Sequence, residues 1–192
     1  MPIDLRAALE AALAKGSLHF YLDASVLIDI VRPETRPESR ELLEIALAKG
    51  WRCTSSPFAV MEALDVQQTN EWLRQGIEEG RAPKALARGM WDRRLPPDRL
   101  TAVRNAFFTG LAQVQDLVRS RRLDRRGWEE AISLAMTTNT WAPDCIHWAT
   151  ALREGCQVFV TSDDTLAKAV RESTMASGEA AEVLAELRSL LG

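Results

Sequence analysis

The sequence predicts an α/β domain in which helices cover both faces of a central parallel sheet, a three-layer α/β/α arrangement. Short, continuous apolar segments at residues 19–22 and 157–161 have the length of buried strands, and amphipathic helical patterns lie between the strand candidates. The chain has 192 residues, 46% of them hydrophobic, which is enough for one sizeable core. We therefore expect a single domain over residues 1–192, with a helical insertion at about residues 70–138.

The first strand candidate ends at an acid. Residues 3–15 carry apolar side chains at helical spacing and stop at Gly16, a typical helix C-cap. The apolar segment 19–22 follows and ends at Asp23, after which residues 24–28 can turn into a helix. We therefore expect a buried strand with Asp23 at its carboxyl end.

A second helix and strand lead to another acid. A helical pattern over residues 38–49 is followed by a short strand candidate at residues 51–55. Ser56 and Pro57 then provide an N-cap and a first-turn proline for a further helix. We expect Glu62 in the second turn of that helix.

The segment 70–138 is expected to be entirely helical. Glycines and prolines divide it, at Gly80, Pro83, Gly89, Pro96, Pro97 and Gly127. One long amphipathic helix is expected within it, because apolar residues recur there at steps of three and four. Its apolar seam consists of Leu100, Val103, Phe107, Leu111, Val114 and Val118. Such a seam packs on the body of the protein or on a partner.

The last third of the chain returns to alternating strand and helix. A helix is expected to start at Asp144 and to end at Gly155. The apolar segment 157–161 leads to Asp163, and a final amphipathic helix covers residues 179–191. A second strand thus delivers a carboxylate to its carboxyl end.

Charge is unevenly distributed. The net charge of −3 argues against a protein that coats nucleic acid, but residues 74–126 carry 13 Lys or Arg and 6 Asp or Glu, a net +7, and the remainder carries −10. An acidic body with a basic middle suits a protein that gathers acids at a metal site and contacts phosphates elsewhere. Because no apolar run approaches the ~20 residues that span a bilayer and the N-terminus lacks a secretory signal pattern, we expect a cytoplasmic protein without membrane contact.

Cysteine and histidine chemistry is excluded by number and spacing. Cys53, Cys145 and Cys156 form no C-x-x-C pair, so buried, reduced thiols are expected. His19 and His147 are too few for a histidine-rich metal site, and the sequence has no nucleophile elbow or phosphate-binding glycine loop. Any catalytic chemistry must therefore rest on carboxylates.

Four acids are expected to converge at one edge of the sheet. The carboxyl ends of parallel strands meet there, and so do the strand-to-helix connections that follow them. The acids are Asp23, Glu62, Asp144 and Asp163. Two carboxylates about 5 Å apart repel by roughly 3 kcal/mol at an effective dielectric of 20, so such a cluster must be relieved by protonation or by a cation. Oxygen ligands favour hard ions, which makes Mg²⁺ or Mn²⁺ the expected cofactor, and such an ion can activate water against a phosphodiester.

Four segments, each with one of these acids, resemble the successive motifs of PIN-domain ribonucleases, and the VapC-type toxins of toxin–antitoxin pairs are the most similar branch. The segments are 22–28 (LDASVLI), 56–62 (SPFAVME), 143–151 (PDCIHWATA) and 158–163 (VFVTSD). The resemblance covers about residues 18–68 and 140–172 and is absent between them. It implies a compact α/β/α fold and Mg²⁺- or Mn²⁺-dependent cleavage of single-stranded or structured RNA that leaves a 5′-phosphate.

The resemblance also implies roles for single residues and partners. The four acids become metal ligands and Ser25 hydrogen-bonds one of them, while Ser162 stands where a small polar residue precedes the last acid, with Asp164 as an auxiliary residue. A homodimer and a small antitoxin protein are the implied partners. The chain departs from the pattern in its long middle segment and in its C-terminal helix, which stands where a short last strand is expected.

Several of these residues also have structural interpretations. Either Asp163 or Asp164 can cap the following helix. Asp29 and Asp65 are expected on solvated helix surface. His147 lies one turn after the acid of its own helix and can touch substrate, but a packed, hydrogen-bonded histidine is the favoured interpretation.

The aromatic and basic residues of the middle segment leave two interpretations open. They can stack on and clamp single-stranded bases, or they can pack helices and present a solvated basic face. The tryptophans concerned are Trp72, Trp91 and Trp128, and the arginines expected to bind substrate are Arg88, Arg93, Arg94, Arg121 and Arg122.

Three functions follow from these observations. The first is a metal-dependent endoribonuclease, and the alternative is a non-catalytic PIN-like module that binds RNA or protein through the helical insertion. The third is a phosphotransfer domain of the receiver or haloacid dehalogenase type. That chemistry needs an Asp-x-Asp pair or a lysine near a strand end, and the segment after Asp23 supplies neither.

Overall fold

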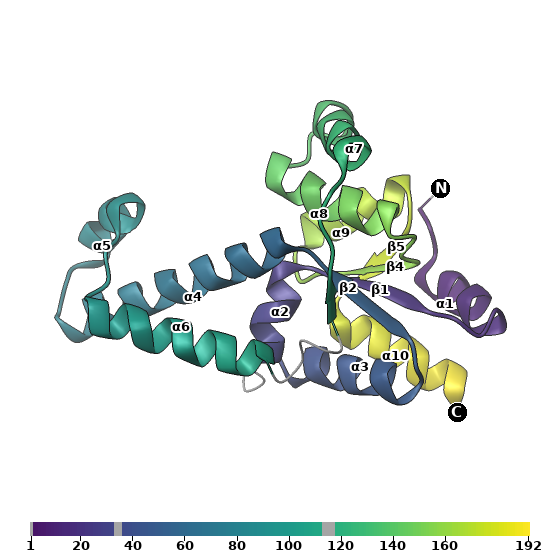
Figure 1. Cartoon of the computed structure of the whole chain (residues 1–192), viewed down its shortest axis with the longest axis horizontal. Helices are drawn as coiled ribbons and strands as arrows, with labels where there is room; N and C mark the ends of the chain where they lie inside the picture. Colours follow the sequence, from purple (N-terminus) through teal and green to yellow (C-terminus); the bar gives the residue numbers. More distant parts are fainter. Residues whose placement is uncertain (1, 33–35, 113–117) are drawn as a thin grey trace.

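A parallel sheet of five strands forms the centre of the structure, in the order β3-β2-β1-β4-β5 (Figure 1). The computed structural model describes residues 2–32, 36–112 and 118–192. The strands are β1 (His19–Leu22), β2 (Arg52–Ser55), β3 (Val118–Ser120), β4 (Val158–Val160) and β5 (Ala176–Gly178). Every neighbouring pair of strands is parallel, so their carboxyl ends lie at one edge. The predicted α/β class is confirmed.

Alternating side chains of the central strands fill two separate cores. In β1, Phe20 and Leu22 belong to the larger buried cluster, whereas Tyr21 points to the opposite face and belongs to a second one. Tyr21 is in register with Phe159 of β4, and their rings stack at a centroid distance of 5.0 Å. Because both faces are buried, these strands are apolar throughout instead of alternating with polar residues.

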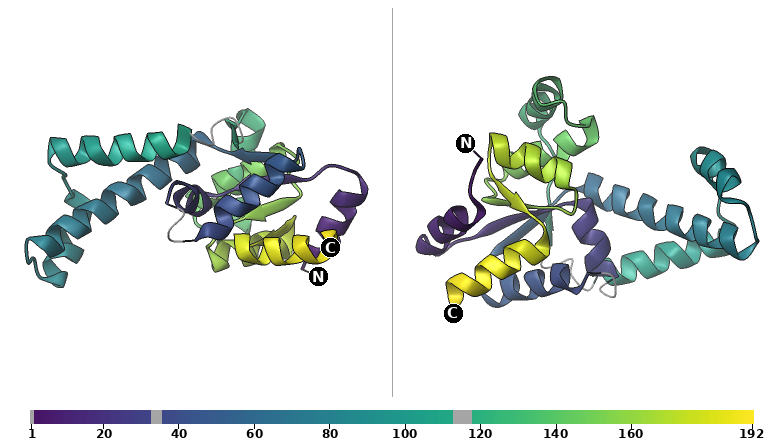
Figure 2. Two further views of the ribbon diagram at one scale, coloured as in Figure 1. Left: turned by 90° about the horizontal axis from the view of Figure 1, so that it is seen from below. Right: turned by 180° about the vertical axis from the view of Figure 1, so that it is seen from behind.

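Helices cover both faces of the sheet, which gives the three predicted layers (Figures 1 and 2). Against the larger core lie α1 (Leu5–Ala14), α2 (Ala24–Val31), α3 (Pro37–Ala48) and α10 (Ala180–Leu191). Against the second core lie α8 (Ala142–Arg153) and α9 (Asp164–Ser173), and α7 (Arg125–Thr137) packs on α8. Gly16 (φ +69°) and Gly155 (φ +66°) end α1 and α8 in the left-handed region, as the sequence predicts.

A helical arm projects from the body (Figures 1 and 2). We call residues 70–112 the arm. It consists of the second part of α4 (Pro57–Glu78), α5 (Pro83–Gly89), the 3-10 helix η1 (Met90–Asp92) and α6 (Pro97–Ala112). Arg99 of α6 ties the two long helices together, because its guanidinium group donates to Glu71 (3.0 Å) and Glu78 (3.2 Å) of α4. At the body end, Ser56 caps α4 as predicted and accepts a hydrogen bond from the Ala59 N–H at 3.0 Å.

The expectation that residues 70–138 are entirely helical is wrong at Val118. This residue begins β3, pairs with Cys53 of β2 and is buried in the larger core. A single valine at helical spacing is equally compatible with a strand, and pairing along the sheet edge decides its conformation. The seam expected around Leu100 does lie in α6, Val114 lies outside the described residues, and Gly127 sits in the first turn of α7 instead of breaking a helix.

The expectation of buried thiols is met. Cys53, Cys145 and Cys156 are all buried and form no disulfide. Among the helices that the structure describes, none combines the length and the apolar character needed to cross a bilayer.

The layered core makes a direct prediction about stability. Phe159 is fully buried between the sheet and α9, so Phe159→Ala should lower the free energy of unfolding by about 3–5 kcal/mol. Trp91 on the arm is 91% exposed, and Trp91→Ala should change it by less than about 0.5 kcal/mol. Urea unfolding followed by circular dichroism measures both values. Equal losses in the two variants would contradict the assignment of the core.

Candidate functional site

Asp23 lies at the carboxyl end of β1, where it contacts the end of β4 and the turn that follows it. Its backbone N–H donates to the carbonyl oxygen of Val160 in β4 at 3.1 Å. Its buried side chain accepts, at Oδ2, hydrogen bonds from Thr161 Oγ1 (2.8 Å) and Ser25 Oγ (3.1 Å). Ser25 Oγ in turn accepts from the backbone N–H of Ser162 at 3.0 Å. The hydrogen bond expected of Ser25 is therefore present.

Asp163 stands three residues after the end of β4 and is the N-cap of α9. Its Oδ1 accepts hydrogen bonds from two backbone N–H groups of the helix, at 2.8 and 2.9 Å, so Asp163 is the helix cap and Asp164 is an exposed first-turn residue. The Asp163 N–H donates to Thr161 Oγ1 at 3.1 Å. The hydroxyl of Thr161 thus joins Asp163 to Asp23, whose carboxylate it also binds.

His147 joins Glu62 to the same site. Its ring is fully buried, with Nε2 at 2.9 Å from Glu62 Oε2 and at 3.8 Å from Asp23 Oδ1. Its Nδ1 lies 2.9 Å from Tyr21 Oη and 3.4 Å from Ser56 Oγ. Because a carboxylate only accepts, this geometry suits the tautomer in which Nε2–H donates to Glu62 and Nδ1 accepts from Tyr21. The packed, hydrogen-bonded interpretation of His147 is confirmed.

The hydroxyl group of Tyr21 is a hydrogen-bond partner of this histidine. Burial raises the pKa of Tyr21 well above its ordinary value, so the hydroxyl remains protonated and can donate to His147. Sequence reasoning missed both Tyr21 and Thr161. The available signals were that Tyr21 is the single tyrosine of the chain, within an apolar strand, and that Thr161 is a hydroxyl residue at the end of another.

Asp144 completes the set from the first turn of α8, one turn before His147. The pKa of Asp144 is raised to about 6, chiefly by burial and in addition by the negative charges of Asp23, Asp163 and Glu62. The nearby His147 acts in the opposite direction. Four acids from separate parts of the chain therefore act on one another at the carboxyl edge of the sheet.

The side chains as they stand do not form a closed ligand set. Among the residues that the structure describes, no group of three or more His, Cys, Asp or Glu side chains has the spacing to hold a metal ion. Three of the acids are instead held by protein donors: Asp23 by two hydroxyls, Glu62 by His147 and Asp163 by helix amides. The donor set nevertheless fits a hard divalent cation, because it consists of carboxylates and a cation would offset their mutual repulsion.

Other acids named from the sequence have structural roles. Asp29 is buried and accepts a hydrogen bond from Ser39 Oγ at 3.2 Å, so the expectation that it lies on solvated surface is wrong. A polar partner on α3 is what makes this burial possible. Asp65 is exposed, as expected, and pairs with Arg93.

The arginines expected to bind substrate fall into two groups. Arg88 lies in α5, and Arg93 and Arg94 follow η1, so these three belong to the arm. Arg121 and Arg122 directly follow β3 on the body, where Arg121 pairs with Glu154 at 3.2 Å. Of the tryptophans, Trp72 is buried and packs beneath the Arg81 guanidinium group at 5.1 Å, whereas Trp91 is 91% and Trp128 49% exposed.

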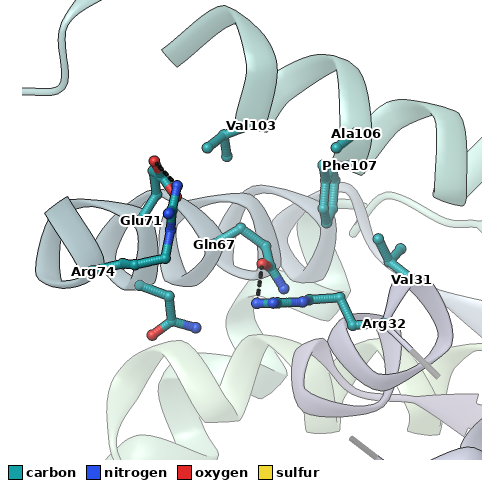
Figure 3. A pocket seen from close by; sticks show the side chains of 9 residues that line it. Val31, Arg32, Gln67, Glu71, Arg74, Val103, Ala106 and Phe107 are labelled. Carbon is teal, nitrogen blue, oxygen red and sulfur yellow. Dashed lines mark hydrogen bonds and ion pairs between the residues drawn. The ribbon is translucent and has the colours of Figure 1, made fainter. Parts of the chain in front are cut away.

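A polar cavity of about 360 Å³ lies where the arm meets α2 (Figure 3). Residues that line it interact with one another. Arg32 donates to Gln67 Oε1 of α4 at 3.2 Å, and Arg74 pairs with Glu71 at 2.7 Å. Phe107 of α6 is buried at one side. None of the four acids lines this cavity, whose walls come from the end of α2 and from α4 and α6.

Comparison with known proteins supports the fold. No family model matches the chain, and no curated protein does. The chain is similar to a solved structure described as the crystal structure of PAE2754 from Pyrobaculum aerophilum, with a TM-score of 0.52 and 16% sequence identity. The match covers 90% of this chain and 98% of that one. A similarity at this identity shows the fold alone.

The raised pKa of Asp144 predicts how stability depends on pH. Because the folded state binds this proton more tightly than the unfolded state, the stabilisation is complete below about pH 4 and is lost as the pH rises through about 6. In the presence of a chelator, Asp144→Asn should therefore be more stable than the parent at pH 7.5, by about 1–2 kcal/mol after allowance for solvent screening, and no more stable at pH 4. Urea unfolding at the two pH values measures this difference.

The matched control is Asp92→Asn on the arm, whose side chain is 90% exposed, so its stability should differ from that of the parent by less than about 0.5 kcal/mol. An Asp144→Asn variant that is less stable than the parent at pH 7.5 would contradict the electrostatic account of the site.

Proposed function

We propose that this chain is a Mg²⁺- or Mn²⁺-dependent nuclease that hydrolyses RNA phosphodiesters, with Asp23, Glu62, Asp144 and Asp163 as the metal ligands. The observation that carries the proposal is the hydrogen-bond network that gathers these acids. Thr161 links Asp23 to Asp163, and the Nε2 atom of His147 faces both Glu62 and Asp23. Asp144 lies one turn from His147 on α8.

The chain's own residues would position the carboxylates. Thr161 and Ser25 bind Oδ2 of Asp23, so its Oδ1 is the oxygen oriented toward the site. Tyr21 and His147 hold Glu62 from behind, in the manner of the outer-shell partners that orient metal ligands. When bound, a divalent cation lowers the pKa of water and offsets charge on the phosphate.

The choice of RNA as substrate rests on the four motifs and on the basic residues near the site. The motifs resemble those of PIN-domain ribonucleases in order and in their acids, and the similarity to VapC-type toxins extends the proposal to a small antitoxin and a second copy as partners. Arg121 and Arg122 supply positive charge on the same body as the acids. A non-catalytic RNA-binding module is the alternative that the following experiment distinguishes.

The proposal predicts that Asp23→Asn and Asp144→Asn abolish cleavage of a labelled single-stranded RNA in Mg²⁺ or Mn²⁺. Each change should reduce the rate by more than the ~100-fold that loss of an outer-shell partner can cost, because each removes a ligand. Asp92→Asn on the arm is the control and should cleave like the parent. Parent-like cleavage by either ligand variant would overturn the site assignment, and a parent that binds RNA without cleaving it would favour the non-catalytic module.

A further inference from the structure

A cavity of about 280 Å³ opens between the start of α4, the segment after β3, and helices α7 and α8. Phe58, Trp128 and Ile146 line it, together with Arg121 and Arg122. An adjoining apolar hollow of about 450 Å³ shares the first three of these residues and continues along α7. Helices α7 and α8 lie side by side on one face of the sheet (Figure 1).

The walls of this cavity combine exposed aromatic rings with unneutralised positive charge. Phe58 is 37% and Trp128 49% exposed, which is unusual for side chains of this size in a folded domain. Within the described part of the chain, no carboxylate forms an ion pair with Arg122. An aromatic face beside a free guanidinium group is the combination that takes up an unstacked base and its phosphate.

The cavity lies close to the carboxylate site. The ring of Phe58 lies 5.3 Å from the ring of His147, measured between centroids, and His147 binds Glu62 at 2.9 Å. A nucleotide whose base occupied the cavity would therefore place a neighbouring phosphate close to the acids.

We infer that this cavity is a subsite for one unstacked base of a single-stranded nucleic acid, with Trp128 and Phe58 contacting the base and Arg122 the adjacent phosphate. The identity of this ligand rests on the proposed function. The volume, near the lower end of the range for small-molecule sites, suits one ring system with its sugar.

Local charge favours a polyanion over a protein surface as the occupant. Residues 118–126 contain five arginines and one aspartate, a net charge of +4, and two of these arginines, Arg121 and Arg122, line the cavity. A phosphate backbone attracts such charge, whereas an uncharged protein surface would bury it without a partner. Binding of a protein partner at this face is therefore an alternative outcome of the test.

The test is the affinity of the full-length chain for a labelled single-stranded RNA, measured by fluorescence anisotropy with EDTA present so that no cleavage occurs. Trp128→Leu should raise the Kd roughly tenfold or more, because stacking contributes about that much per base. Arg122→Gln should also raise the Kd and should weaken its dependence on salt. The controls are Trp91→Leu on the arm and Arg40→Gln on α3, both of which should bind like the parent.

An RNA of the same length with abasic positions separates stacking from other effects. The parent and Trp128→Leu should bind this abasic RNA equally, since neither can stack on a missing base. A folding defect in Trp128→Leu would instead weaken the binding of both RNAs. Equal losses from Trp91→Leu and Trp128→Leu would overturn the proposal. An unchanged RNA affinity in Trp128→Leu would also overturn the proposal. If the sedimentation of that variant changed while its RNA affinity did not, the face would instead be assigned to a protein contact.

Failure of this inference is distinguishable from failure of the proposed function. Stacking at Trp128 without cleavage by the parent in Mg²⁺ or Mn²⁺ would leave the subsite intact and remove the nuclease assignment. Loss of cleavage in Asp144→Asn, with RNA affinity unchanged in Trp128→Leu, would support the nuclease assignment and remove the subsite.

Discussion

The mutual repulsion of four carboxylates at one edge of a parallel sheet is the constraint on which this structure depends. The sheet delivers Asp23 and Asp163 at strand ends, and helices deliver Glu62 and Asp144 to the same edge. Hydrogen bonds from Thr161 and His147 hold Asp23 and Glu62 in place, and burial together with the neighbouring negative charges raises the pKa of Asp144 to about 6. A domain with only ~5–15 kcal/mol of stability is expected to retain such an arrangement for a purpose, and binding a hard cation is the one that its oxygen ligands suit.

Much of the fold could be predicted from the sequence, because its strongest signals are local. The apolar strand before Asp23, the cap at Ser56 and the glycine at Gly155 each specify their own element. The two outer strands could not be predicted. Val118 fits a helix as well as a strand, and the β5 segment Ala-Ser-Gly has no apolar pattern, so both become strands only through pairing with neighbours far away in sequence.

The candidate site divides in the same way. The acids could be named because each stands near the end of a strand or the start of a helix, and the hydrogen bond of Ser25 was implied by the resemblance of its segment to a known family motif. Their support could not be predicted, because Tyr21 and Thr161 act through contacts across more than a hundred residues. The burial of Asp29 against Ser39 is an equivalent case, since a tertiary hydrogen bond overrides the preference of a carboxylate for water.

Binding of Mn²⁺ observed by anomalous diffraction tests the central claim most directly. A crystal of the unmodified protein soaked in Mn²⁺ should show one or two anomalous peaks within bonding distance of carboxylate oxygens from Asp23 and Asp144, with Glu62 or Asp163 completing the set. Anomalous peaks confined to other parts of the surface, or the absence of any peak at this edge in a well-diffracting soaked crystal, would contradict the account.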